Sequence, residues 1–286
     1  MKLIKRDKYC IILLLVFILI FCVYVLSYKS IKENMNVTEV RVLSYENDES
    51  NEHKKDLENK LIYYGYNHVF LGAGEKWEGF GTKIKAYKEY IKNINLHDED
   101  ILVIIDSRDV YVNRPSKELI GAFREFYEKH GGDLDKNLKL VFSSETACCT
   151  TGVTDKEKDK MKSVALERDP NLKKEIDSYY LNTGLCIGYV KAFKKHYLNI
   201  DMDLDDDDQT KITNYWLNGH LDDIILDYNH ELFSNAHIWG NEDNLHGCNY
   251  SKENNRFVLS NSNISPFFIQ TPAKYWKCYD YLYNIE

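Results

Sequence analysis

The stretch Ile101-Leu-Val-Ile-Ile-Asp106-Ser-Arg-Asp109 decides the fold of this sequence. Its first five residues are apolar at every position, which is typical of a strand covered on both faces inside an α/β sheet. Two carboxylates follow this run, and ligands of such sheets bind at the carboxyl ends of the strands. The stretch therefore predicts a central strand over residues 101–105 and a site at its end.

Strand-like and helix-like segments alternate on both sides of this stretch. Strands are predicted over residues 37–45, 68–71, 138–142, 224–226, 256–259 and 267–269, and helices over residues 51–64, 83–94, 117–130, 156–164 and 207–217; residues 184–190 are apolar and contain glycine. The 286 residues suffice for one or two domains. The alternation favours a single α/β domain over residues 37–286, built on a mixed, mostly parallel sheet.

The first 36 residues differ from the rest of the chain. Basic residues Lys2, Lys5, Arg6 and Lys8 precede an apolar run that begins at residue 10. The basic flank is expected to stay in the cytoplasm. We therefore expect a cytoplasmic tail (residues 1–9), a transmembrane signal anchor (10–28) and a stem (29–36). A cleaved signal peptide is the alternative. The anchor predicts a single-pass type II membrane protein that faces the lumen of the endoplasmic reticulum or Golgi.

Charge and cysteine content limit the partners of the chain. A net charge of −8 and a pI of about 5.7 do not attract nucleic acid. Five cysteines follow the anchor and could pair in an oxidising lumen, although an odd number leaves at least one free or bonded to another chain. They are Cys148, Cys149, Cys186, Cys248 and Cys278. Glycosylation sequons at Asn36, Asn249 and Asn263 also fit a lumenal chain.

The carboxylates of Asp106 and Asp109 are the strongest candidates for chemistry. Two carboxylates three residues apart can converge on one cation, and their hard oxygen atoms suit Mg²⁺ or Mn²⁺. Such a cation would neutralise a diphosphate as it leaves. Alternatively, Asp106 caps a turn. A strand followed by Asp is also found in phosphatases.

Three further segments have both a functional and a structural interpretation. The acidic run at residues 205–209 could bind sugar hydroxyls or could begin a solvated helix. Asn182-Thr-Gly184 could let the backbone approach a ligand, or Gly184 could permit tight strand packing. Trp77 lies in a predicted loop, where its ring could stack on a base or a sugar or could cover the core edge.

These motifs, taken in order, resemble one family. They are GEKWEG at residues 74–79, IIDSRDV at 104–110, VFSSETACC at 141–149, LNTGLCIGY at 181–189, DDDDQ at 205–209 and ILDYNHELF at 225–233. The series is similar to the glycosyltransferase domain of procollagen lysyl hydroxylases and their collagen galactosyltransferase relatives. It covers nearly the whole chain after the anchor.

The resemblance implies a GT-A-like, Rossmann-like nucleotide-sugar transferase with Mn²⁺ or Mg²⁺ as its metal and a UDP-sugar as its donor. The acceptor hydroxyl would belong to a glycan or a collagen-like protein. It assigns the metal to Asp106, Asp109 and Gln270. It gives donor-binding roles to Trp77, Lys83, Arg108, Glu145, Gly184 and Asp227, and catalytic roles to Asn182, Asp207 and Asp208.

Three positions depart from the family pattern. Arg108 replaces an aromatic residue that stacks on uracil, although a planar guanidinium can also stack on a base. Gln270 replaces a metal-binding histidine, and Cys149 replaces a tryptophan. These departures motivate a rival hypothesis, in which the domain has lost activity and binds glycans or protein partners. A metal-dependent phosphatase that uses Asp106 is a second rival.

Overall fold

The computed structural model describes residues 38–146, 148, 152–170, 172, 178–236, 248–260, 262–272 and 276–284. The chain divides into two units, Met1–Glu39 and Val40–Glu286, and the elements below belong to the second. The predicted tail and anchor lie outside the described residues, as does the predicted stem. Among the helices that are described, none has the length and apolar character needed to cross a bilayer.

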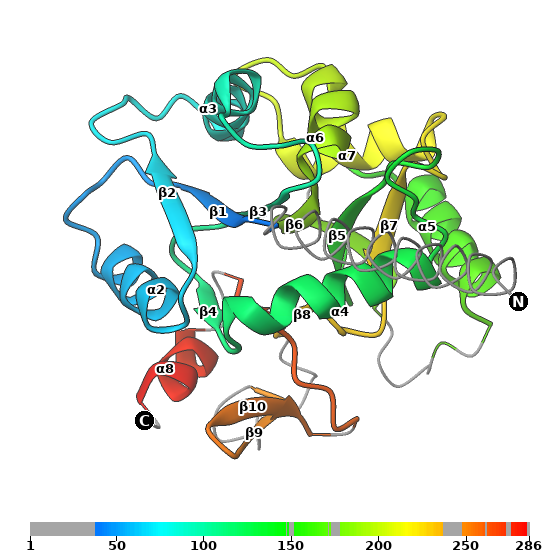
Figure 1. The fold of residues 1–286 in the computed structure, drawn as a ribbon. Helices are drawn as coiled ribbons and strands as arrows, with labels where there is room; N and C mark the ends of the chain where they lie inside the picture. The colour runs from blue at the N-terminus through cyan, green and yellow to red at the C-terminus, as the bar shows by residue number, and fades with distance from the viewer. Residues whose placement is uncertain are drawn as a thin grey trace, which may run out of the picture. The chain divides into compact units, whose positions relative to one another are not determined.

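A six-stranded sheet forms the centre of the second unit (Figure 1). Its strands, in spatial order, are β2 (Asn67–Leu71), β1 (Val40–Tyr45), β3 (Ile101–Ile105), β6 (Tyr180–Tyr189), β5 (Leu140–Glu145) and β7 (Ile224–Asp227). Strand β6 runs antiparallel to both of its neighbours, and the other pairings are parallel. The mixed, mostly parallel sheet predicted from the sequence is therefore confirmed.

Helices cover both faces of this sheet. They are α2 (Glu52–Tyr63), α3 (Phe80–Asn93), α4 (Ser116–Lys129), α5 (Asp155–Arg168), α6 (Val190–Lys195) and α7 (Asp208–Leu217), with a 3₁₀ turn η1 (Tyr197–Asn199) after α6. Along β3, Leu102 and Ile104 pack with α3, α5, α6 and α7, whereas Ile101, Val103 and Ile105 pack with α2 and α4. Side chains of a strand alternate between faces, so a strand buried on both sides is apolar throughout.

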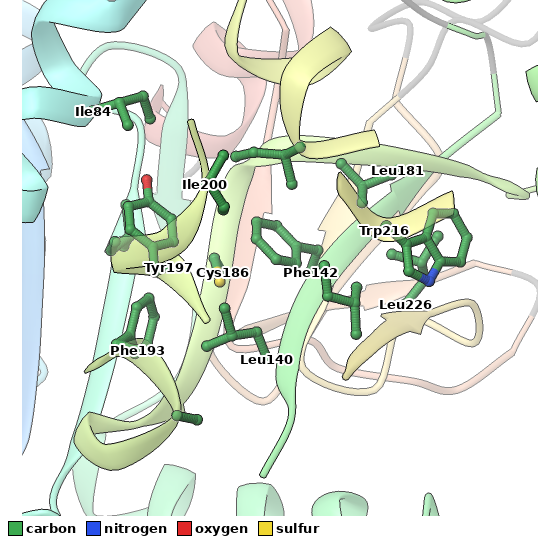
Figure 2. Close-up of a cluster of buried hydrophobic side chains, with 14 of the residues drawn as sticks. Ile84, Leu140, Phe142, Leu181, Cys186, Phe193, Tyr197, Ile200, Trp216 and Leu226 are labelled. Atoms are coloured by element: carbon green, nitrogen blue, oxygen red, sulfur yellow. The ribbon is translucent and has the colours of Figure 1, made fainter. Parts of the chain in front are cut away.

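Figure 2 shows part of the first of these two cores. The rings of Phe142, Phe193, Tyr197 and Trp216 are almost completely buried there. Cys186 lies among them as a free, buried thiol. This packing fixes β5 and β6 beside α7, and so it positions the polar groups at the ends of these elements.

A smaller sheet was only partly predicted from the sequence. It contains β4 (Val110–Val112), β11 (Phe268–Gln270) and β8 (Phe233–Asn235), with β11 in the middle. Beside it lie a hairpin of β9 (Tyr250–Glu253) and β10 (Arg256–Leu259) and the helix α8 (Trp276–Asn284). A disulfide joins Cys248 to Cys278 and thereby links the start of the hairpin to α8.

Candidate active site

A cleft of about 600 Å³ opens where β1 and β3 end. Its lining comprises Tyr45, Glu46, Asn47, Trp77, Phe80, Lys83, Asp106, Ser107, Arg108, Asp109 and Trp276. Five residues of the sequence prediction thus meet in one cavity: Trp77, Lys83, Asp106, Arg108 and Asp109. The strand order brings them together because parallel β1 and β3 are neighbours and end at the same sheet edge.

Two carboxylates and one amide converge at the floor of the cleft. Asp106 directly follows β3, and Asp109 directly precedes β4. Gln270 ends β11, which pairs with β4 so that Gln270 lies opposite Val110. The Nε2 atom of Gln270 donates to Asp106 Oδ2 at 3.1 Å and lies 3.4 Å from both oxygens of Asp109.

This cluster has the donor atoms that a hard divalent cation requires. Burial and the negative charge of Asp106 raise the pKa of Asp109 to about 8. The surrounding residues therefore do not balance the negative charge of two ionised carboxylates. Gln270 Oε1 is buried and finds no hydrogen-bond partner within the described chain. Rotation of that amide would present Oε1 to the carboxylates. The resulting set of oxygen ligands suits Mg²⁺ or Mn²⁺.

Gly184 supports the amide of Gln270. It lies on β6, and its carbonyl oxygen accepts a hydrogen bond from the backbone amide of Asp106 at 2.8 Å. A Cβ atom at this position would lie 2.3 Å from Gln270 Nε2 and Oε1. The close approach expected at this glycine is therefore made by a side chain of the same molecule.

Lys83 connects the floor of the cleft to the acidic run. Its Nζ atom lies 2.9 Å from Asp106 Oδ1 and 3.0 Å from Asp208 Oδ2. Burial opposes the charge of Lys83, but the two carboxylates outweigh it and raise the lysine pKa. Thr183 also donates to Asp208, at 3.1 Å. Asp208 is thus a buried member of the site, held by residues of α3 and β6.

Asp207 has a different environment from its neighbour. It is the N-cap of α7, and its Oδ1 atom accepts the backbone amide of Thr210 at 2.7 Å. This is the structural interpretation considered for the acidic run, because a capping carboxylate satisfies an otherwise unpaired amide of the first turn. The cap orients α7 so that Asp208 points toward Lys83.

Glu145 and Asn182 form a second polar cluster next to the first. The Oε2 atom of Glu145 accepts from Asn182 Nδ2 at 2.9 Å, and its Oε1 atom accepts from Gln209 Nε2 at 2.6 Å. Burial raises the pKa of Glu145 to about 7, although both hydrogen bonds oppose this. Asn182 Oδ1 accepts the amide of Gly184 at 2.8 Å, which joins the two clusters through β6.

Arg108 is held by a carboxylate that the sequence did not reveal. Its Nε and Nη2 atoms each lie 2.7 Å from an oxygen of Glu46, and Ser107 donates to Glu46 at 3.0 Å. Glu46 directly follows β1, just as Asp106 directly follows β3. This shared position after a strand was the sequence feature that could have indicated Glu46 as a site residue. The guanidinium lies at the cleft wall with its orientation fixed.

Aromatic side chains form the remaining walls. Trp77 and Phe80 are both about half exposed, and their rings meet edge to face at 5.7 Å. Tyr45 packs against Trp77, with 5.8 Å between the ring centroids. Trp276, at the start of α8, also lines the cleft and stacks on His53. Of these rings only Trp77 was predicted; Tyr45 and Trp276 come from distant parts of the sequence, whereas Phe80 lies three residues after Trp77.

Asp227, to which the resemblance gave a donor-binding role, is not among the residues that line this cleft. Its carboxylate is completely buried and accepts the backbone amides of Glu231, Leu232 and Phe233 at 2.7–2.9 Å. Burial raises the pKa of Asp227 to about 7 against these hydrogen bonds. Through these hydrogen bonds the residue holds the turn between β7 and β8.

Comparison with known families is decisive for the class of protein. The PLOD GT domain model matches residues 36–284, which is nearly the whole described chain. The chain belongs to the PLOD GT domain family. This PLOD GT domain is accordingly a glycosyltransferase. It is 26% identical over 183 residues to a multifunctional procollagen lysine hydroxylase and glycosyltransferase of Caenorhabditis elegans. That match covers 60% of this chain and 22% of the worm protein, so the chain spans about a fifth of it.

Solved structures give more distant likenesses to this PLOD GT domain. A glycosyltransferase involved in the glycosylation of the major capsid of PBCV-1 is 12% identical, with a TM-score of 0.47 over 85% of this chain and 98% of that one. Glucosyl-3-phosphoglycerate synthase of Mycobacterium tuberculosis, solved with Mn²⁺, uridine diphosphate and phosphoglyceric acid, is 15% identical. Its TM-score is 0.34 over 66% of this chain and 68% of that chain.

Proposed function

We propose that this domain transfers a sugar from a UDP-sugar to an acceptor hydroxyl with the help of a divalent cation. The observation that carries the proposal is the convergence of Asp106, Asp109 and Gln270, with both carboxylates lining a cleft that has aromatic walls. A cavity of about 600 Å³ falls within the usual size range of small-molecule sites.

The cation would be held by the two carboxylates and by the amide oxygen of Gln270. When bound, it would supply positive charge that stabilises the leaving diphosphate. Lys83 adds a fixed positive charge beside Asp106 in the same cleft. The cluster is otherwise acidic, so binding of the cation would relieve the repulsion between Asp106 and Asp109.

The donor base would bind between aromatic and cationic walls. Trp77, Phe80 and Trp276 offer partly exposed ring faces to the cleft. Arg108 offers a planar guanidinium whose orientation is set by its two hydrogen bonds to Glu46. Both kinds of group stack on flat rings, and Arg108 thereby takes the place of the aromatic residue expected at this position.

The acceptor side would use Asp208, Glu145 and Asn182. Asp208 is the carboxylate nearest the metal cluster on this side, because Lys83 bridges it to Asp106. Carboxylates accept strong hydrogen bonds from hydroxyl groups, so Asp208 is our choice to orient a sugar or acceptor hydroxyl. Membership of the PLOD GT domain family supports hydroxyl groups of a collagen-like protein or its glycan as acceptors.

Donor turnover is the test of this proposal. Purified protein with Mn²⁺ and UDP-sugars should release UDP. Donor binding should also stabilise the protein against heat, by about 2.7 kcal/mol when the donor concentration is 100 times its dissociation constant. Asp109→Asn should abolish the Mn²⁺-dependent part of both signals, whereas Asp135→Asn, at a carboxylate that is 89% exposed, should not. Full activity in Asp109→Asn would show that the carboxylate pair is structural.

A second candidate is a domain that binds glycans or protein partners without transferring sugar. The Gln270 amide favours it, because its NH₂ group already contacts both carboxylates. In that case donors or glycans would bind without any Mn²⁺-dependent release of UDP. Turnover of any UDP-sugar above the level of Asp109→Asn would reject this candidate.

We further propose that the chain is anchored in the membrane and faces an oxidising lumen. The apolar segment at residues 10–28 behind four basic residues supports the anchor. The disulfide between Cys248 and Cys278 supports the lumen, because such bonds persist in oxidising compartments. In microsomes the chain should resist carbonate extraction and external protease. A shortened, extractable form would indicate a cleaved signal peptide instead.

A further inference from the structure

A cluster of metal-ligating side chains lies at the opposite edge of the sheet from the cleft. His196 is the C-cap of α6, while His220 and Asp223 belong to the turn between α7 and β7. This turn precedes the first residue of β7, and its Asp223 carbonyl accepts the amide of Leu140, the first residue of β5. Strands β1 and β3 run in the same direction as β5 and β7. The cleft lies where β1 and β3 end, and the cluster lies where β5 and β7 begin, so the two sites are remote from each other.

The three side chains lie close to the spacing of a coordination site. Their ligand atoms all lie within 4.8 Å of one another. Asp223 Oδ2 accepts a hydrogen bond from His220 Nδ1 at 2.8 Å, which a bound ion would replace, and it lies 3.7 Å from His196 Nδ1. Ligands about 2.0–2.2 Å from a tetrahedral Zn²⁺ stand roughly 3.3–3.6 Å apart. Small side-chain movements would therefore complete the site.

The hydrogen bond of His196 fixes which of its nitrogen atoms faces the cluster. His196 is 1% exposed, and its Nε2 atom lies 2.9 Å from the carbonyl oxygen of Leu138. A carbonyl only accepts, so Nε2 carries the hydrogen and Nδ1 presents its lone pair to Asp223. A histidine that ligates a metal is held in this way, with its second nitrogen donating to a carbonyl or carboxylate.

The turn that carries the other two groups is also held in place. Two backbone hydrogen bonds fix it. The His220 amide donates to the Trp216 carbonyl at 3.2 Å, and the Asp223 amide donates to the His220 carbonyl at 3.1 Å. The His220 ring stacks on Tyr215 with 3.8 Å between centroids.

We infer that His196, His220 and Asp223 form a second metal site, which takes Zn²⁺ or a similar imidazole-preferring ion. Two imidazole nitrogens and one carboxylate oxygen suit Zn²⁺ better than the all-oxygen cluster of the cleft does. His220 and Asp223 are partly exposed, so water can occupy the fourth position. The ion would tie the end of α6 to the turn that starts β7.

The test separates this site from the cleft by removing the cleft's ligands. The full chain with Asp106→Asn and Asp109→Asn serves as the parent, and Zn²⁺ is titrated by calorimetry after treatment with a chelator. We expect one Zn²⁺ per chain and a rise in the melting temperature. Adding His220→Ala should weaken binding at least about tenfold. Adding His97→Ala, at an exposed histidine, should leave it unchanged.

Circular dichroism should show that the His220→Ala protein is folded, which is expected because this ring is partly exposed. X-ray absorption of the bound Zn²⁺ should show two imidazole ligands in the parent and one in His220→Ala. A folded parent that binds no Zn²⁺ would overturn the inference. Equal affinity in parent and His220→Ala would overturn it as well.

Discussion

The side-chain amide of Gln270 packs directly on the backbone of Gly184, where an added Cβ would lie 2.3 Å from both amide heteroatoms. The contact leaves the amide little room to move away from Asp106 and Asp109. Strand β6 therefore sets the position of the third member of the proposed metal cluster, although it contributes no ligand itself.

Gly184→Ala should displace this amide and weaken Mn²⁺-dependent donor turnover by about tenfold, the scale of losing one supporting contact at a metal site. The matched control is Gly121→Ala in α4, where a Cβ meets no atom within 4 Å. That control should retain turnover and gain about 0.5–1 kcal/mol of stability. Steady-state turnover and urea unfolding measure both effects. Equal turnover in the two variants would contradict the assigned role of Gln270.

Gln270→His should change the metal preference of the domain. An imidazole nitrogen binds Mn²⁺ better than a neutral amide oxygen does, whereas Mg²⁺ prefers oxygen ligands. The variant is therefore expected to gain more activity in Mn²⁺ than in Mg²⁺. Titration of both metals in parent and variant checks this. An inactive parent that becomes active as Gln270→His would favour the binding-only candidate for the natural protein.

Lys83→Met should make the metal-free domain less stable and more responsive to metal. Removing one member of a buried ion pair costs about 3–5 kcal/mol, but Asp106 is about one-third exposed, so we expect about 1–3 kcal/mol. The remaining carboxylates of Asp106 and Asp208 would then repel each other. Mn²⁺ should raise the melting temperature more than in the parent. Lys85→Met, on the exposed face of α3, should change neither value.

The raised pKa of Asp109 predicts the pH dependence of the metal-free protein. Its folded-state pKa of about 8 lies above the ordinary value of 3.8, so the folded state retains a proton that the unfolded state releases. Stability should therefore fall as pH rises from about 4 to 8. Binding of Mn²⁺ requires the ionised carboxylate and should tighten over the same range.

Urea unfolding in chelator and Mn²⁺ titration, both at pH 5 and pH 8, test these two trends. Asp109→Asn cannot ionise at this position, so its stability should fall less with pH than that of the parent. If parent and variant show the same pH dependence, the pKa of Asp109 is not raised in solution.

The main sheet could be predicted because its strands carry their own signals. Residues 101–105 are apolar at each position and form β3 with those bounds. Strands β4, β8 and β11 have three residues each, which is too short for a periodic pattern. The apolar run at residues 267–269 indicated a strand near β11, but its partners come from distant parts of the chain.

The candidate site could be predicted where its members are close in sequence. Asp106 and Asp109 are three residues apart and meet because one short turn joins β3 to β4. The Glu46–Arg108 pair joins residues 62 positions apart, so no local pattern reveals it. Asp227 is the last residue of β7, yet the next turn uses its carboxylate. Sequence alone does not distinguish such a turn from a binding site.

The disulfide between Cys248 and Cys278 has a practical consequence for anyone preparing this domain. Trp276, a wall of the cleft, lies two residues before Cys278 on the same helix. Closing this loop, whose cysteines lie 30 residues apart, contributes about 3–4 kcal/mol in the chain-entropy model. Material made in a reducing cytosol would lack this constraint on α8. Its donor affinity would then depend on the redox history of the sample.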